Sequence, residues 1–148
     1  MFHASPHILI VAANFYPDVT GELLAGARTA LTKMSASFDE IEVPGAFEIP
    51  AAINFAIQSK KYDGYVALGC VVRGETSHYD YVCSESARGI MDLALTKNAA
   101  IGYGILTVEN MDQAFVRANV AEGNKGHDAV EACLRLIAIK NQFERKLL

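Results

Sequence analysis

The segment Val72–His78 contains residue types that bind phosphate and move protons. It follows an apolar run and precedes a helical pattern, so it predicts a loop between a buried strand and a helix. The free backbone N–H groups at such a helix start attract an anion, and the hydroxyls of Thr76 and Ser77 add donors. The same hydroxyls also serve as helix caps, so this segment alone leaves both interpretations open. Glu75 opposes a phosphate site unless its carboxylate points away.

His78 stands at the expected start of that helix, beside the candidate phosphate loop. An imidazole with a pKa near neutrality can give and take protons on a bound substrate. A single histidine more often has a structural hydrogen-bonding role. The other histidines, His3, His7 and His127, form no metal-ligand spacing with His78, so we expect no metal ion.

Two aromatic residues, Phe15 and Phe47, each come just after an expected strand. A ring in that position can stack on a planar heterocycle, although core packing is the commoner role of a single ring. Glu48 can accept hydrogen bonds from a polyol. Arg117 and Lys125 are the cations that would complete a phosphate site, but isolated surface charges are usually only solvated.

The three cysteines, Cys70, Cys83 and Cys133, are odd in number and show no CxxC spacing. Their neighbours are mainly apolar or small, which predicts free, buried thiols rather than disulfides or zinc ligands. One alternative is a cysteine hydrolase in which Cys70 is the nucleophile and His78 the base. The two valines that follow Cys70 indicate a buried thiol and argue against it.

The pattern of apolar residues indicates the elements that position these groups. Apolar runs predict strands at residues 7–13, 41–43, 65–72 and 100–108. Helical spacing predicts helices at residues 18–35, 49–60, 78–97, 111–121 and 127–147. Strands that alternate with helices and are apolar along their length indicate a four-stranded parallel sheet covered on both faces. We therefore expect a doubly wound, three-layer α/β/α domain of the flavodoxin-like kind.

Ligands of such folds bind at the carboxyl ends of the strands, which here places the candidate site in four loops. These loops span residues 14–18, 44–48, 72–78 and 108–111. Flavodoxin-like sheets hold flavins and nucleotides at this edge, so a non-catalytic flavin- or nucleotide-binding module is a second alternative.

Composition limits the classes of protein to consider. The chain has 148 residues, of which 51% are apolar and 20% charged, and we expect one packed domain over residues 1–148. A net charge of −4 without a cluster of basic residues argues against binding to nucleic acid or to anionic lipid. The apolar runs are too short to cross a bilayer, and no basic segment followed by a long apolar one begins the chain. These features predict a cytoplasmic protein.

Three segments occur together in an order that extends the argument beyond single residues. They are VPGAFEIP at residues 43–50, GCVVRGETSHYDYV at 69–82 and GNKG at 123–126, with Phe15 before them and GILT and an arginine between the last two. Through them the chain resembles the lumazine synthase family along nearly its whole length. The resemblance implies the condensation of 5-amino-6-(D-ribitylamino)uracil with 3,4-dihydroxy-2-butanone 4-phosphate. The products are 6,7-dimethyl-8-ribityllumazine, phosphate and water, and the reaction uses neither a cofactor nor a metal.

The resemblance also implies a role for each candidate residue. His78 matches the residue proposed to transfer protons, with Asp128 as its partner. Thr76 and the backbone N–H of Glu75 match the positions that hold the phosphate, and Arg117 matches its charged ligand. The pyrimidine and its ribityl chain would contact Phe15, Ala46, Phe47, Glu48, Cys70, Val71 and Val72.

In this family the active site lies between adjacent subunits of a homopentamer. Tyr103 matches an aromatic position that closes the pocket from the neighbouring subunit, and Arg117 and Lys125 would also come from the neighbour, with Lys125 near the phosphate. Association with riboflavin synthase is a further implied partnership. Only about six residues precede the first strand, so we expect a free pentamer rather than a sixty-subunit capsid.

Overall fold

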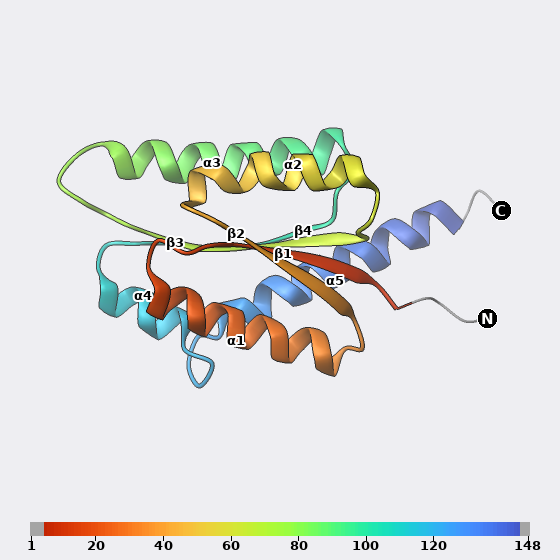
Figure 1. Cartoon of the computed structure of the whole chain (residues 1–148), viewed down its shortest axis with the longest axis horizontal. Helices are drawn as coiled ribbons and strands as arrows, with labels where there is room; N and C mark the ends of the chain where they lie inside the picture. The colour runs from red at the N-terminus through yellow and green to blue at the C-terminus, as the bar shows by residue number, and fades with distance from the viewer. Residues whose placement is uncertain (1–4, 146–148) are drawn as a thin grey trace.

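The computed structural model of the chain describes residues 5–145 and shows one sheet between two layers of helices (Figure 1). The strands are β1 (His7–Ala13), β2 (Ser37–Val43), β3 (Gly64–Val72) and β4 (Ile101–Val108). They pair in the order β2-β1-β3-β4, and every pair is parallel. The expected four-stranded parallel α/β/α architecture is therefore confirmed.

The helices divide between the two faces of the sheet (Figure 1). They are α1 (Pro17–Lys33), α2 (Ile49–Ser59), α3 (His78–Thr96), α4 (Met111–Ala118) and α5 (Lys125–Arg145), and a short 3₁₀ turn, η1 (Ala46–Glu48), precedes α2. Helices α2 and α3 cover one face, while α1, α4 and α5 cover the other. Within residues 5–145 no helix combines the length and the apolar character needed to cross a membrane.

Strand β1 shows why the central strands are apolar along their whole length. Ile8 and Ile10 belong to the core shared with α1, α4 and α5, whereas Leu9 and Val11 belong to the core beneath α2 and α3. Each of these four side chains is at most 2% exposed. Because helices cover both faces, the positions of the strand from Ile8 to Ala13 are buried and no alternation of polar residues develops.

Strand β2 begins at Ser37, four residues before the predicted start at Ile41. The strand lies at an edge of the sheet and most of its side chains are exposed, so its polar first half resembles a loop in sequence. Arg28 of α1 donates two hydrogen bonds to Glu40, at 2.6 and 2.7 Å, and so ties this edge strand to the helix layer. The forked contact lowers the pKa of the Glu40 carboxyl below its ordinary value.

Smaller differences concern the ends of the last two helices and one cysteine. Helix α4 ends at Ala118 rather than at residue 121, and α5 begins at Lys125 rather than at residue 127. Cys70 and Cys133 are buried, but Cys83 is only half-buried, so the expectation of three buried thiols is wrong for Cys83. The predicted end of α5 at residue 147 and residues 1–4 of the short amino-terminal segment lie outside the described residues.

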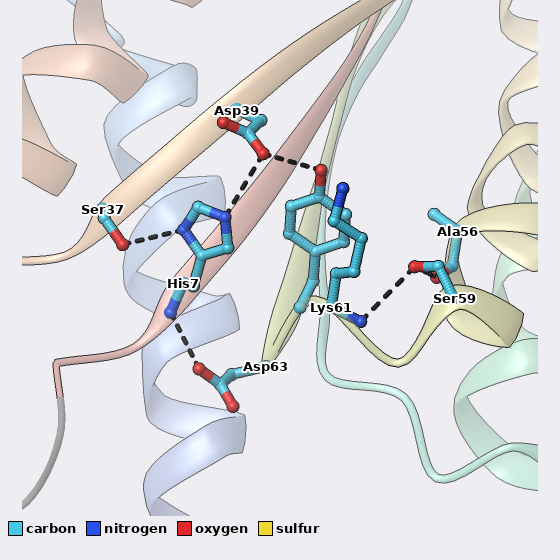
Figure 2. A network of polar contacts seen from close by, with 8 residues as sticks. His7, Ser37, Asp39, Ala56, Ser59, Lys61 and Asp63 are labelled. Atoms are coloured by element: carbon cyan, nitrogen blue, oxygen red, sulfur yellow. Dashed lines mark hydrogen bonds and ion pairs between the residues drawn. The ribbon is translucent and has the colours of Figure 1, made fainter.

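A polar network holds the amino-terminal ends of β1 and β2 together (Figure 2). The ring of His7 contacts the Ser37 hydroxyl at 2.7 Å and an Asp39 carboxylate oxygen at 3.3 Å, and it stacks on Tyr62. Tyr62 donates to the same Asp39 oxygen at 2.7 Å, which is the main cause of the lowered pKa of that carboxyl. The backbone N–H of His7 donates to Asp63 at 2.8 Å. This network fixes the end of the sheet opposite to the predicted ligand-binding loops.

Candidate functional site

A cavity of about 470 Å³ lies at the carboxyl ends of β1, β2 and β3. It is lined by Phe15, Tyr16, Pro44, Gly45, Ala46, Phe47, Glu48, Cys70, Val71, Val72, Gly74, Thr76, His78, Tyr79 and Val82. Three of the four loops selected from the sequence contribute to it, and the loop at residues 108–111 does not. The cavity thus joins candidate residues that are more than sixty positions apart in the chain.

The aromatic side chains at the cavity are available to a ligand. Phe15 is 67% exposed and contacts Tyr16 edge-on, while Phe47 is 56% exposed. Both rings border the same cavity, so together they form an exposed apolar surface at one place, which is typical of a binding site. The core-packing interpretation of both residues is therefore wrong, and both rings can cover a planar heterocycle.

The turn after β2 brings Phe47 and Glu48 to the cavity. Pro44 ends the strand, and the N–H of Glu48 donates to the Gly45 carbonyl at 3.2 Å to close the turn η1. A Cβ added at Gly45 would lie 3.3 Å from a Glu48 carboxylate oxygen, so this carboxylate lies over the glycine. Glu48 directly precedes α2, where the helix dipole stabilises a carboxylate.

The loop between β3 and α3 presents free hydrogen-bond donors. Across the part of the chain that the structure describes, none of the backbone N–H groups of residues 74–77 donates to a protein acceptor. Ser77 occupies the N-cap position of α3 without a side-chain capping bond, and Thr76 Oγ1 accepts from the His78 N–H at 3.3 Å. Thr76 therefore has the capping role and also lines the cavity. Glu75 does not line it.

His78 is the first residue of α3 and is exposed at the cavity. No described residue forms a hydrogen bond with its ring, so both ring nitrogens remain open to a ligand. Tyr79 and Val82 line the cavity from the same turns of α3. Sequence reasoning missed both residues. The spacing of four between positions 78 and 82, which places them on one helix face, was a signal that could have identified Val82. It also missed Tyr16, which carried no signal apart from its position beside Phe15.

Among its described lining residues, the cavity contains no lysine or arginine side chain that could balance a bound phosphate. Arg117 lies in the last turn of α4 and donates to the Gln113 carbonyl of its own helix at 3.0 Å. Lys125 begins α5 and forms a 3.3 Å ion pair with Asp128. Within one chain, then, these two predicted phosphate ligands lie outside the cavity.

Tyr103 and Asp128 also lie apart from the cavity of their own chain. Tyr103 is 40% exposed on β4, and its hydroxyl is 3.5 Å from that of Ser86 in α3. The described side-chain contacts of Asp128 are with Lys125 and His127, not with His78. The expected pairing of Asp128 with His78 is therefore not made inside a single chain.

Backbone conformation and close packing explain three of the four residues of the segment GNKG. Asn124 adopts a left-handed conformation with φ of 48°, which asparagine tolerates better than most residues. A Cβ added at Gly123 would lie 2.7 Å from the backbone of Arg117, and one at Gly126 would lie 2.0 Å from the Leu23 carbonyl. Only Lys125 is left with an exposed side chain that can reach a ligand.

Cys70 lines the cavity but is a poor nucleophile. It is 5% exposed, and burial raises the pKa of its thiol to about 11. The thiolate is the reactive form, so at neutral pH this cysteine remains protonated and unreactive. This environment argues against the cysteine hydrolase alternative.

Comparison with known proteins points to one family. Residues 5–141 match the family described as 6,7-dimethyl-8-ribityllumazine synthase. The chain is similar to proteins of that name from Bartonella bacilliformis, at 56% identity over 95% of this chain and 94% of the relative, and from Bartonella tribocorum, at 58% over 93% and 92%. It is also similar to the 6,7-dimethyl-8-ribityllumazine synthase 1 of Rhizobium meliloti, at 51% identity over 93% of both chains.

Proposed function

The chain belongs to the 6,7-dimethyl-8-ribityllumazine synthase family, and from this premise we propose how its cavity carries out the reaction. The enzyme acts in riboflavin biosynthesis and condenses 5-amino-6-(D-ribitylamino)uracil with 3,4-dihydroxy-2-butanone 4-phosphate. It releases 6,7-dimethyl-8-ribityllumazine, phosphate and water. The observation that carries the proposal is that two exposed rings and a loop of free N–H groups border one cavity.

The pyrimidine substrate occupies the part of the cavity near Phe15 and Phe47. Stacking between the exposed rings and the heterocycle removes apolar surface from water and orients the substrate plane. Glu48 accepts hydrogen bonds from the ribityl hydroxyls, and Ala46 completes the wall beneath them. The end of β3, from Cys70 to Val72, contributes mainly backbone groups because its side chains are largely committed to the two cores.

The butanone phosphate binds at the start of α3. The N–H groups of Glu75 and Thr76 and the Thr76 hydroxyl donate to its oxygens, and the positive end of the helix adds to the attraction. Glu75 does not line the cavity, so we propose that it contributes its N–H rather than its carboxylate. His78 then lies beside the bond-forming atoms.

The reaction needs orientation and proton transfer rather than a strong nucleophile. The aromatic amine attacks the ketone and forms an imine with loss of water, after which phosphate leaves. The resulting enol tautomerises, and the ribityl-bearing nitrogen closes the ring with loss of water. His78 moves protons in these steps, which contributes roughly 10²–10⁴-fold in typical enzymes, and holding the two substrates together contributes the rest.

We propose that the active site is completed by a neighbouring subunit of a pentamer. The support is that the described lining of the cavity has no lysine or arginine side chain of its own, although the second substrate carries a phosphate. Arg117 and Lys125 of the neighbour supply this charge. Tyr103 of the neighbour covers the heterocycle, since its ring is 40% exposed at the β4 edge of the sheet. Asp128 of the neighbour approaches His78.

The remaining parts of the proposal concern the whole protein. We propose that the chain is one domain, supported by a single sheet with helices on both faces within residues 5–145. The protein is a free cytoplasmic pentamer that uses no cofactor and associates with riboflavin synthase. Light scattering tests the oligomer, because a mass of sixty protomers contradicts the free pentamer.

The stoichiometry of the products tests the reaction. We expect one phosphate released for each lumazine formed, and phosphate release without lumazine contradicts the proposed chemistry.

A further inference from the structure

Arg73 is the first residue after β3 and has contacts that the site described above does not use. Its backbone N–H donates to the Val108 carbonyl at 2.9 Å, which continues the β3–β4 ladder by one residue. Its guanidinium donates from Nε to a Glu109 oxygen at 2.7 Å and from one terminal nitrogen to Asp80 at 3.5 Å. The guanidinium carbon also lies 4.2 Å from the centre of the Tyr79 ring.

These contacts connect three segments that border the phosphate loop. Tyr79 and Asp80 belong to the first turn of α3, and Glu109 directly follows β4. The side chain of Arg73 therefore closes a bridge across residues 74–78, from the end of β3 to the start of α3. Within that span the only described side-chain bond to the backbone is the 3.3 Å contact between Thr76 and His78.

Arg73 does not line the cavity, and two carboxylates already neutralise its charge. It is consequently not the cation that the phosphate lacks. A planar guanidinium suits this bridging role because it stacks on a ring with its face while its edge donates to carboxylates, which an ammonium group cannot do. Single exposed ion pairs stabilise a protein little, but here three contacts converge on one group.

We propose that Arg73 is a positioning residue, whose bridge to Tyr79, Asp80 and Glu109 holds the phosphate loop and His78 in the arrangement that binds the butanone phosphate. This inference rests on the proposed function. A loop ordered in advance loses less conformational freedom on binding, so the bridge favours the phosphate substrate in particular. The pyrimidine, held by Phe15 and Phe47 at the other end of the cavity, depends on it less.

Four variants test the proposal by steady-state kinetics with each substrate varied in turn. For Arg73→Met we expect kcat/KM for the butanone phosphate to fall on the order of 10–100-fold, as for small displacements of binding groups. Equilibrium binding of the pyrimidine alone should change less than about threefold, since stacking is retained. Arg73→Lys should recover only part of the loss, and Glu109→Gln should lie between wild type and Arg73→Met. Arg88→Met is the matched control, because Arg88 pairs with Glu85 and Asp92 on α3 away from the cavity.

Hydrogen exchange provides a readout that does not need turnover. In Arg73→Met and Glu109→Gln we expect faster exchange of the hydrogen-bonded N–H groups of His78, Asp80 and Tyr81 at the start of α3, with exchange in β1 unchanged. Kinetics equal to those of Arg88→Met, equal losses for both substrates, or full recovery by lysine would each contradict the proposal. If Arg73→Met does not fold, unchanged kinetics in Arg73→Lys and Glu109→Gln overturn it. An inactive wild type overturns the proposed function instead, and the exchange rates still decide whether Arg73 orders the loop.

Discussion

Phe15 and Phe47 follow neighbouring strands of the sheet and border one cavity, although each ring is more than half exposed. If they sandwich or cover the pyrimidine, removal of either ring should weaken its binding. We expect Phe47→Ala to raise the dissociation constant of the pyrimidine by roughly 5–100-fold, the range found for stacking of a base on an aromatic side chain.

Phe55→Ala is the control for that measurement. Phe55 is 70% exposed on α2, the same helix that Phe47 precedes, but it does not line the cavity. Titration calorimetry should therefore show wild-type affinity for Phe55→Ala. Equal weakening in both variants would mean that the loss of Phe47 acts through general destabilisation.

Subunit mixing tests whether neighbouring chains share each site. In the proposed mechanism His78→Ala should impair proton transfer, and Arg117→Met should remove the positive charge that binds the phosphate. Each pure variant should therefore be strongly impaired. In a ring assembled at random from equal amounts of both, about a quarter of the sites combine an intact His78 with an intact Arg117 from the neighbour.

After co-refolding, the mixed assembly should thus regain about a quarter of the wild-type rate. The control is each variant refolded alone. A mixture no more active than the mean of its components would place both residues in one subunit's site. The His78→Ala protein should retain residual turnover, because proton transfer is only one part of the rate enhancement.

The buried thiols predict how stability depends on alkaline pH. Burial raises the pKa of Cys70 to about 11 and that of Cys133 to about 12, against an ordinary value of 9.0. Above that ordinary value the unfolded chain loses thiol protons that the folded chain keeps. The free energy of unfolding should therefore fall as the pH rises from about 9 to about 11.

Urea titrations at pH 8 and pH 10.5 measure this dependence. In Cys70→Ala the free energy of unfolding should decrease less between these two pH values than in wild type. The variant should keep its turnover at pH 7, because residue 70 contributes mainly backbone groups to the cavity. Loss of turnover on alkylation of Cys70 at pH 7 would instead support a reactive thiol and revive the hydrolase interpretation.

The close contact of α5 with α1 predicts a structural role for Gly126. A Cβ there would lie 2.0 Å from the Leu23 carbonyl oxygen, and backbone cannot give way as a flexible side chain can. Gly126→Ala should therefore lower the free energy of unfolding by about 1–3 kcal/mol, the usual cost of overpacking.

Gly21→Ala is the matched change in the helix that Gly126 contacts. Gly21 lies inside α1 with nothing within 4 Å of an added Cβ, so alanine should stabilise the protein by roughly 0.5–1 kcal/mol. Chemical denaturation of both variants measures these changes. An unchanged free energy of unfolding in Gly126→Ala would show that the two helices can move apart without cost.

The sequence predicted the fold where burial was complete. Helices cover most of the central strands β1 and β3, and the run from Ile8 to Ala13 indicated its strand correctly. Strand β2 was predicted too short because Ser37, Asp39 and Glu40 lie on an exposed edge, where neighbouring segments rather than hydrophobicity hold the strand.

For the site, the sequence predicted which loops meet, because parallel strands end at one edge of the sheet. It did not predict the contribution of Tyr79 or the bridge made by Arg73, since both depend on how side chains pack between separate elements. Arg117 and Lys125 lie outside the cavity of their own chain. The proposal that a neighbouring chain supplies them concerns contacts between chains, which periodicity within one chain does not encode.

The most direct test of the central claim is the rate of lumazine formation by the wild-type protein, followed by absorbance with both substrates present. A protein-free reaction is the control for any condensation of the amine and the ketone without enzyme. We predict acceleration that saturates with each substrate and that falls roughly 10²–10⁴-fold at most in His78→Ala. A folded oligomer that binds the pyrimidine but forms lumazine no faster than the protein-free control would contradict the account and favour a non-catalytic flavin-binding module.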